Sequence, residues 1–250
     1  MIYKRNFLKS VIFRIDFDKI ELGKLKVFLD KISKTFPLIE EEKGEEGTIS
    51  FDLKTKELKQ VSNALTSWNI YNKTKTIRIK IHSSFLTIEY FNYKDSSELL
   101  SNIGIIADFL KDFGVKTINR LGLRYINEIK IEGKDPLDWS IYINEKLLGL
   151  TSFAIGNKKM VARAMGFIVF KEEFGDINFN YGLWNSAYPS AIAERVFILD
   201  FDGYSRFPLD TEGIDLGSLV KEYNGKIEEL FEKSIKEDLR KVLNKFNERL

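Results

Sequence analysis

Residues 119–129 read NRLGLRYINEI, an apolar run that also holds two arginines, a glycine, a tyrosine, two asparagines and a glutamate. Successive side chains of a β-strand point to opposite faces of a sheet. One face of a strand here would carry Leu121, Leu123, Tyr125, Asn127 and Ile129. The other face would carry Arg120, Gly122, Arg124, Ile126 and Glu128. The stretch predicts a central strand with one face in the core and a charged second face.

Three residues of this strand have specific expected roles. Tyr125 is expected to bury its ring and keep its hydroxyl hydrogen-bonded. Asn127, if buried, must find partners or cost roughly 1–3 kcal/mol, and we expect it to bond backbone groups of an irregular connection nearby. Gly122 is expected to let a neighbouring chain or an aromatic ring lie close over the strand.

The two arginines of the strand, Arg120 and Arg124, have two alternative roles. They pair with aspartates of neighbouring strands, or they form a bidentate clamp for an anionic ligand or partner. The candidate aspartates are Asp16, Asp18, Asp200 and Asp202. Pairing is favoured, because a sheet face that carries both signs tends to neutralise itself across strands.

The first half of the chain alternates strand and helix patterns. Residues 11–18 are predicted as a strand, residues 22–36 as a helix, and residues 67–91 as a three-strand meander. A helix is expected to follow Asp95, with Glu98 completing a capping box and Gly114 as its C-cap. The acidic segment 40–47 is expected to be a solvated loop, and residues 50–66 fit a strand or a helix.

The second half repeats this order. After the opening strand, a short helix is expected at 135–147, strands at 160–170, 176–184 and 194–202, and one long helix at 217–248. Both halves, about 1–115 and 116–250, read as β-α-β-β-β-α. The sequence predicts an α+β fold with a mainly antiparallel sheet, helices over one face and two pseudo-repeated halves. Because no Gly/Ser/Pro-rich linker separates them, residues 1–250 are expected to form a single domain.

Composition excludes several classes of function. The 250 residues include 39 lysines and arginines against 37 aspartates and glutamates, so no strong overall charge draws the chain to nucleic acid or a membrane. No cysteine and one histidine rule out thiolate zinc sites, cysteine nucleophiles and histidine-rich metal sites. No secretory signal and no membrane-length apolar stretch is seen, and a cytoplasmic protein without a cofactor is expected.

The aspartates are also a candidate metal site. IDFD at 15–18 and LDFD at 199–202 each place two carboxylates on one side of a strand: Asp16 with Asp18, and Asp200 with Asp202. Such pairs can hold Mg²⁺ for phosphoryl or phosphodiester chemistry. The competing interpretation is that aspartates simply end strands on a solvated face.

A candidate nucleic-acid or anion-binding patch is formed by Lys73, Lys75, Arg78 and Lys80, to which Arg120 and Arg124 are added as an anion clamp. Trp68 and Tyr71 would be stacking platforms for bases. A solvated basic face is favoured over nucleic-acid binding, because charge runs are usually solvated.

Two segments are candidates for contact with a partner. The aromatic segment 181–194, YGLWNSAYPSAIAE, could line a pocket or an interface, or fold its rings onto the core. The far end of the C-terminal helix could project beyond the domain and serve dimerisation. A homo-oligomer or a complex with another protein is expected.

The motif R-x-G-L-R-Y-I-N-x-I at 120–129 resembles the signature of a sporadically distributed, uncharacterised prokaryotic family of about this length. ERVFILDFDGY at 194–204 is similar to a second block of that family. LFEKSIKEDLR at 230–240 is similar to its last block, although Lys236 stands where the family often has threonine. The resemblance implies no known activity, cofactor or substrate. By analogy with its patchy distribution, it implies a link to mobile-element or defence genes.

These observations favour a protein that works by binding, as a partner-interaction module or as a subunit of a larger complex. No catalytic residue is assigned. The alternatives are a metal-dependent enzyme that acts on nucleotides or nucleic acid through the aspartate pairs, and nucleic-acid binding without catalysis.

Overall fold

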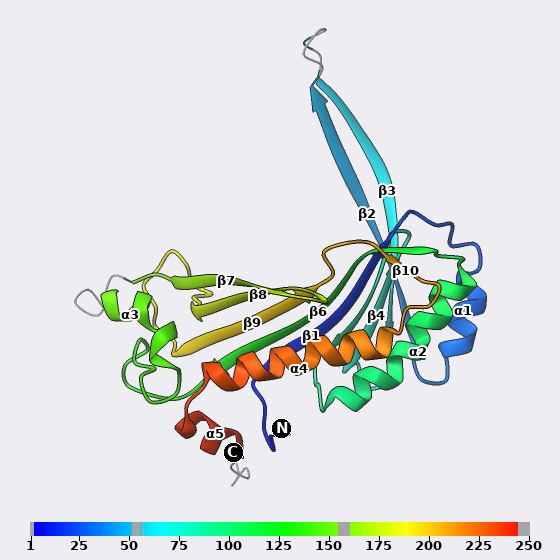
Figure 1. Cartoon of the computed structure of the whole chain (residues 1–250). Coiled ribbons are helices and arrows are strands. Elements are labelled where there is room, and N and C mark those ends of the chain that lie inside the picture. Colours follow the sequence, from blue (N-terminus) through cyan, green and yellow to red (C-terminus); the bar gives the residue numbers. More distant parts are fainter. Residues whose placement is uncertain (1–2, 52–55, 57, 155–160, 245–250) are drawn as a thin grey trace.

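The structure, a computed structural model, describes residues 3–51, 56, 58–154 and 161–244 (Figure 1). Its strands pair antiparallel in one sheet, in the order β2-β3-β4-β5-β1-β6-β9-β8-β7, and β10 also pairs with β6. The strands are β1 (Leu8–Phe17), β2 (Leu38–Phe51), β3 (Leu58–Tyr71), β4 (Ile77–His82), β5 (Phe85–Tyr90), β6 (Thr117–Lys130), β7 (Ala164–Glu172), β8 (Gly175–Leu183), β9 (Val196–Tyr204) and β10 (Leu209–Asp210).

The helices are α1 (Leu25–Ile32), α2 (Ser96–Asp112), α3 (Gly149–Ala154), α4 (Leu216–Ser234) and α5 (Glu237–Asn244), with a 3₁₀ turn η1 (Glu145–Leu147). The two longest, α2 and α4, lie across the same face of the sheet (Figure 1). The prediction of an α+β fold with a large antiparallel sheet is confirmed. Within the described residues, none of the helices combines the length and the apolar character needed to cross a bilayer.

Residues 119–129 belong to β6, an inner strand of this sheet. β6 pairs with β1 along one edge and with β9 along the other. Leu121, Leu123 and Ile129 are fully buried, as their alternation predicts. The opposite rows of β1 and β6 are only partly buried. The core therefore lies between the sheet and the helices, and the strands present their second row of side chains on the other side.

Asp95 caps the start of α2 and Gly114 follows its end, as predicted, whereas the bond from the Glu98 side chain that would complete a capping box is not among the hydrogen bonds of the described residues. The Asp95 carboxylate accepts hydrogen bonds from the backbone N–H groups of Ser97 at 2.9 Å and Glu98 at 3.3 Å. These N–H groups have no partner within the helix, so the aspartate stabilises its first turn. Gly114 follows the helix with φ +65, a conformation that residues with a Cβ rarely adopt.

The prediction of a solvated loop at 40–47 is wrong. This acidic segment belongs to β2, which pairs with β3 along its whole length. In Figure 1 the two strands form a long hairpin that extends away from α2 and α4. Residues 38–44 of β2 are exposed on both faces, and such a stretch needs no apolar row, so it lacks the alternation that identifies a half-buried strand. In the ambiguous segment 50–66, residues 50–51 and 58–66 are strand and Lys56 is not, while residues 52–55 and 57 lie outside the described residues.

The single long helix expected at 217–248 is wrong as well. The chain leaves the helical conformation at Ile235, with φ −110 and ψ 155, and α5 starts two residues later. Ile235 is buried and forms an isolated β-bridge with Ile143. The bridge forms because Lys236 donates its backbone N–H to the Tyr142 carbonyl at 2.8 Å. Residues 245–248 lie outside the described residues.

The helix predicted at 135–147 is reduced to η1. The preceding residues form turns around Trp139, whose ring is buried against Phe197 of β9. The indole N–H donates to the Pro136 carbonyl at 3.1 Å. The buried ring of Trp139 therefore holds this segment against the core, in place of the apolar helix face that the sequence pattern indicated.

Candidate binding site on the uncovered sheet face

We use the term uncovered face for the side of the sheet opposite α2 and α4 (Figure 1). The alternate side chains of β1, β4, β5, β6 and β9 lie on it. The arginines of this face keep substantial exposure: 41% of the side chain for Arg14, 37% for Arg120 and 43% for Arg124. This face carries most of the polar residues that the sequence singled out.

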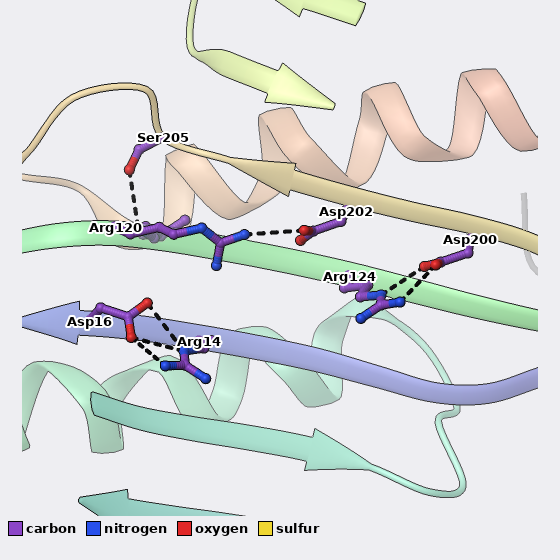
Figure 2. A network of polar contacts seen from close by, with 8 residues as sticks. Arg14, Asp16, Arg120, Arg124, Asp200, Asp202 and Ser205 are labelled. Atoms are coloured by element: carbon purple, nitrogen blue, oxygen red, sulfur yellow. Dashed lines mark hydrogen bonds and ion pairs between the residues drawn. The ribbon is translucent and has the colours of Figure 1, made fainter. Parts of the chain in front are cut away.

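The two arginines of β6 pair with the aspartates of β9, as Figure 2 shows. Arg124 makes a bidentate contact with Asp200, with its Nε 2.8 Å from Oδ1 and its Nη2 2.7 Å from Oδ2. Arg120 donates from Nη2 to Oδ2 of Asp202 at 3.1 Å. The predicted pairing across neighbouring strands is confirmed. Asp200 is the more enclosed carboxylate, with 9% of its side chain exposed.

The other two candidate aspartates have partners close to them. Arg14 donates from Nε to Asp16 at 2.9 Å within the same strand, and its guanidinium lies 4.3 Å from the centre of the Phe85 ring. Asp18 accepts from the side-chain amide of Asn119 at 2.9 Å. Among the described residues, no three His, Cys, Asp or Glu side chains are grouped so that they could hold a metal ion. The four aspartates therefore do not fit a shared Mg²⁺ site.

The candidate basic patch is neutralised by glutamates. Lys75 donates to Glu40 at 2.8 Å, and Lys80 donates to Glu42 at 2.7 Å. Arg78 forms an ion pair with Glu89 of β5, while Lys73 is exposed in the turn between β3 and β4. The sequence did not indicate these ion pairs, because its pattern predicts a loop for Glu40 and Glu42. The β2–β3 register instead brings both glutamates beside the lysines.

The charges of this face change each other's ionisation. The hydrogen bond from Lys80, followed by that from Asn69, lowers the pKa of Glu42 to about 2. The hydrogen bond to Asp200 raises the pKa of Arg124. Burial raises the pKa of Asp202, although Arg120 and Arg124 act in the opposite direction. At Asp202, therefore, the effect of desolvation on the pKa outweighs that of the cationic neighbours.

The charged side chains enclose a hollow of about 620 Å³ that spans β4, β5, β1, β6 and β9. It is lined by Ile12, Arg14, Asp16, Arg78, Lys80, Phe85, Thr87, Glu89, Arg120, Gly122, Arg124 and Asp202. The hollow is polar and open to solvent.

Gly122 lies between the two arginines of β6. A Cβ on this residue would be 2.9 Å from Nη1 of Arg120, so the guanidinium folds over the glycine. The same guanidinium lies 5.1 Å from the centre of the Tyr204 ring. The expectation that a neighbouring chain or aromatic ring covers Gly122 is wrong, because the group that uses the space is the side chain of Arg120.

Tyr125 and Asn127 point to the covered side of the sheet. The Tyr125 ring is buried, and its hydroxyl lies 2.8 Å from the Tyr93 hydroxyl and donates to Asn224 at 2.7 Å, as predicted. Asn127 bonds backbone, but its amide donates to the Leu199 carbonyl of β9 at 3.1 Å, not to an irregular connection. Both residues line a second cavity of about 280 Å³ beside α4.

An exposed apolar group at the β7 edge was not identified from the sequence. Phe167 is 59% exposed and Val169 is 42% exposed. The β7–β8 register places them opposite Asn180 and Asn178, on the uncovered face. The alternation in GFIVFK could have shown this row, but it was read only as a strand signal. We call Phe167 and Val169, together with Trp184 and Tyr188, the β7 apolar group.

Segment 181–194 divides its rings between the core and the surface: Tyr181 packs against Phe179, with 5.0 Å between the ring centres, whereas Trp184 and Tyr188 stay exposed. Trp184 and Tyr188 are 45% and 59% exposed, and the Arg163 guanidinium lies over both rings, at 4.1 and 4.6 Å from their centres. Asn185 is buried beneath them and donates to the carbonyls of Ala162 and Ser190. The segment therefore presents an ordered pair of aromatic rings to solvent.

A scan against protein-family models and a search of curated proteins gave no match to this chain, so the site is described by its geometry alone.

Proposed function

We propose that this protein is a partner-interaction module and that the uncovered sheet face is its binding surface. The observation that carries the proposal is a set of five ion pairs across this face. They are Arg14–Asp16, Arg78–Glu89, Lys80–Glu42, Arg120–Asp202 and Arg124–Asp200. Paired side chains are held in fixed positions before a partner arrives, so less side-chain entropy is lost on binding.

A protein fits this surface better than a nucleic acid does. Each of the five cations in these pairs has its own carboxylate, so this part of the face has no large positive field to attract a polyanion. Protein interfaces, in contrast, are enriched in arginine and aromatic residues and use complementary charges to set orientation. Nucleic-acid binding and metal-dependent catalysis therefore remain the less favoured alternatives.

The β7 apolar group supplies the anchor that an ion-paired surface lacks. Interface energy is usually concentrated in a few aromatic and arginine residues. Phe167, Trp184 and Tyr188 are of this kind, and Arg163 is stacked on two of the rings. We propose that the partner contacts the β7 apolar group and the ion pairs together, and that it is a second copy of this chain or another protein.

Two further predictions belong with this proposal. The pseudo-repeat of the halves is supported by the strand order, which runs β5, β4, β3 outward from β1 and β9, β8, β7 outward from β6. A cytoplasmic location and a link to mobile-element or defence genes follow only from composition and from the resemblance. The binding proposal depends on neither of them.

Site-specific photo-crosslinking tests the proposal. A photoreactive amino acid is placed at Thr87 or Asn178 on the uncovered face, and at Lys221 on the exposed side of α4 as the matched control. In cells of the source organism, we expect crosslinked products from the first two positions and not from the third, with mass spectrometry identifying the partner. Products from Lys221 alone, or none from any position, would contradict a binding role for this face.

A further inference from the structure

Three arginines surround the glycine floor of the hollow. Arg120 and Arg124 stand on either side of Gly122 along β6, and Arg14 of β1 is its direct cross-strand partner. All four residues line the 620 Å³ hollow. Because Gly122 has no side chain, the guanidinium of Arg120 can lie close over the strand at this point.

Each of these arginines binds its carboxylate through part of its guanidinium group, and the remaining N–H groups are not used in that ion pair. Arg124 binds Asp200 through Nε and Nη2, and Arg14 binds Asp16 through the same two nitrogens. Arg120 uses Nη2 for Asp202. Within the described part of the chain, the Nη1 groups of the three arginines make no hydrogen bond. The carboxylates thus fix the guanidinium groups without using all of their donors.

We infer that the hollow around Gly122 binds a single phosphoryl group carried as a phosphate monoester. The inference rests on the proposed binding role of the uncovered face and names the chemistry that the face recognises. Arg14, the cross-strand partner of Gly122, and Arg120, whose guanidinium lies over that glycine, bring donors from two neighbouring strands, and a monoester presents three terminal oxygens that can accept from them. Arginine is suited to such oxygens because its N–H groups form charge-assisted hydrogen bonds in a fixed geometry.

The carboxylates around the hollow favour a single phosphoryl group over a nucleic-acid strand. Asp16, Glu89 and Asp202 line the same hollow. The phosphates that follow along a nucleic-acid strand would lie against these carboxylates, whereas a lone phosphoryl group contacts only the free guanidinium edges. The phosphate ester is expected on a side chain of the protein partner or on a small molecule, and the two sources are separated by experiment.

Titration calorimetry of the full-length protein with four probes tests the inference. The probes are inorganic phosphate, O-phosphoserine, a phosphoserine-containing peptide with its unphosphorylated form, and a single-stranded oligonucleotide. We expect the phosphoserine probes to bind and the unphosphorylated peptide to bind at least about tenfold more weakly. A peptide that binds more tightly than free O-phosphoserine identifies a protein source; equal affinities identify a small molecule.

Two substitutions assign the binding to the hollow. Arg14→Gln removes one donor and frees only Asp16, whose side chain is 25% exposed. Gly122→Ala places a methyl group 2.9 Å from Nη1 of Arg120 and so displaces that guanidinium. Each is expected to weaken phosphoserine binding about tenfold or more. Gly104→Ala in α2, where nothing lies within 4 Å of the added Cβ, and Lys130→Gln at the far end of β6 are expected to leave it unchanged.

The inference fails if no phosphate probe binds at millimolar concentration, if both variants bind like the unsubstituted protein, or if the oligonucleotide binds more tightly than the phosphopeptide. Circular dichroism of each variant verifies that the fold is retained. Crosslinks from Thr87 and Asn178 to a partner that carries no phosphate would leave the proposed function intact and overturn only the phosphoryl inference. Absence of those crosslinks would overturn the proposed function instead.

Discussion

Arg124 of β6 reaches diagonally to Asp200 of β9, although its direct cross-strand partner is Asp202. Asp202 is thereby left to Arg120, which lies beyond Gly122 and leans over that glycine to reach it. The two pairs form a staggered ladder in which each arginine contacts the aspartate displaced along β9 from its own position. The ladder ties β6 to β9 at the middle of the sheet.

Breaking the Arg124–Asp200 pair is expected to destabilise the fold. Arg124→Ala leaves the Asp200 carboxylate, 9% exposed, without its bidentate partner. A buried group that loses its hydrogen-bond partner costs about 1–3 kcal/mol. We expect a lower melting temperature and a lower urea midpoint, measured by circular dichroism.

The matched control is Lys130→Ala at the end of the same strand. Its pair with Glu194 is exposed, at 65% for both side chains, so its loss is expected to leave the melting temperature and the urea midpoint essentially unchanged. The double variant Arg124→Ala/Asp200→Asn should recover part of the stability, because it removes the unpaired charge. An Arg124→Ala protein of unchanged stability that had lost its ligand would make this arginine a binding residue and not a structural one.

Removing the glutamates that mask the basic patch is expected to create nucleic-acid affinity. Glu40 and Glu42 pair with Lys75 and Lys80. With both changed to Gln, the lysines are free to bind phosphates and release counterions, so affinity for a single-stranded oligonucleotide should rise at low salt. Fluorescence anisotropy between about 50 and 200 mM salt measures the gain and its salt dependence.

Glu41→Gln is the control for that experiment. Glu41 lies opposite Trp68 in the register and therefore faces the other side of the hairpin, away from Lys80. The Glu41→Gln substitution removes one negative charge but leaves Lys75 and Lys80 paired with Glu40 and Glu42. Little gain in affinity for the oligonucleotide is therefore expected. An equal gain for each charge removed, from Glu41→Gln and from the Glu40/Glu42 variant, would show that net charge, and not the pairing, governs binding.

The hydrogen bonds of Glu42 also predict an acid dependence. Its folded pKa of about 2 lies below the ordinary value of 4.5. The unfolded chain therefore binds the proton first as the pH falls, so this pair stabilises the fold above about pH 4.5 and the contribution is lost as the pH falls toward 2. Carboxyl carbon NMR measures the titration directly. Lys80→Met should raise the pKa of Glu42 toward 4.5, and an unshifted value in the unsubstituted protein would contradict the pairing.

The local sequence pattern correctly predicted those parts of the fold that depend on residues close together in the sequence. Alternation was sufficient for the two faces of β6, and Asp95 was sufficient for the start of α2. The Arg–Asp pairing followed from the same alternation, because charged rows on neighbouring strands must meet.

The predictions were wrong where the local structure depends on residues that are distant in the sequence. Ile235 fits the helical stripe of its own segment, yet the bridge to Ile143, about ninety residues earlier, ends α4 there. Glu40 and Glu42 look like loop residues until the register with β3 is known. The hollow could not be predicted either, since its floor depends on which strand lies opposite Gly122.

The buried tyrosines predict a second pH dependence, at alkaline pH. Burial raises the pKa of Tyr93 to about 12 and that of Tyr125 well above its ordinary value of 10.0. Both phenols belong to one hydrogen-bonded chain, in which Tyr125 donates to Asn224 and accepts from Tyr93. A phenolate formed in this chain would lose a donor and be buried without a compensating charge.

The sign of the effect follows from the direction of these pKa shifts. Above pH 10 the unfolded chain releases tyrosine protons that the folded chain retains, so the free energy of unfolding falls as the pH rises. Phenolate absorbance at alkaline pH should therefore appear in two stages, the second coinciding with unfolding seen by circular dichroism. Tyr125→Phe should lower stability and reduce the second stage, whereas Tyr188→Phe, at a ring that is 59% exposed, should leave stability unchanged. If all ten tyrosines ionised together near pH 10 in a folded protein, the buried chain of phenols would be contradicted.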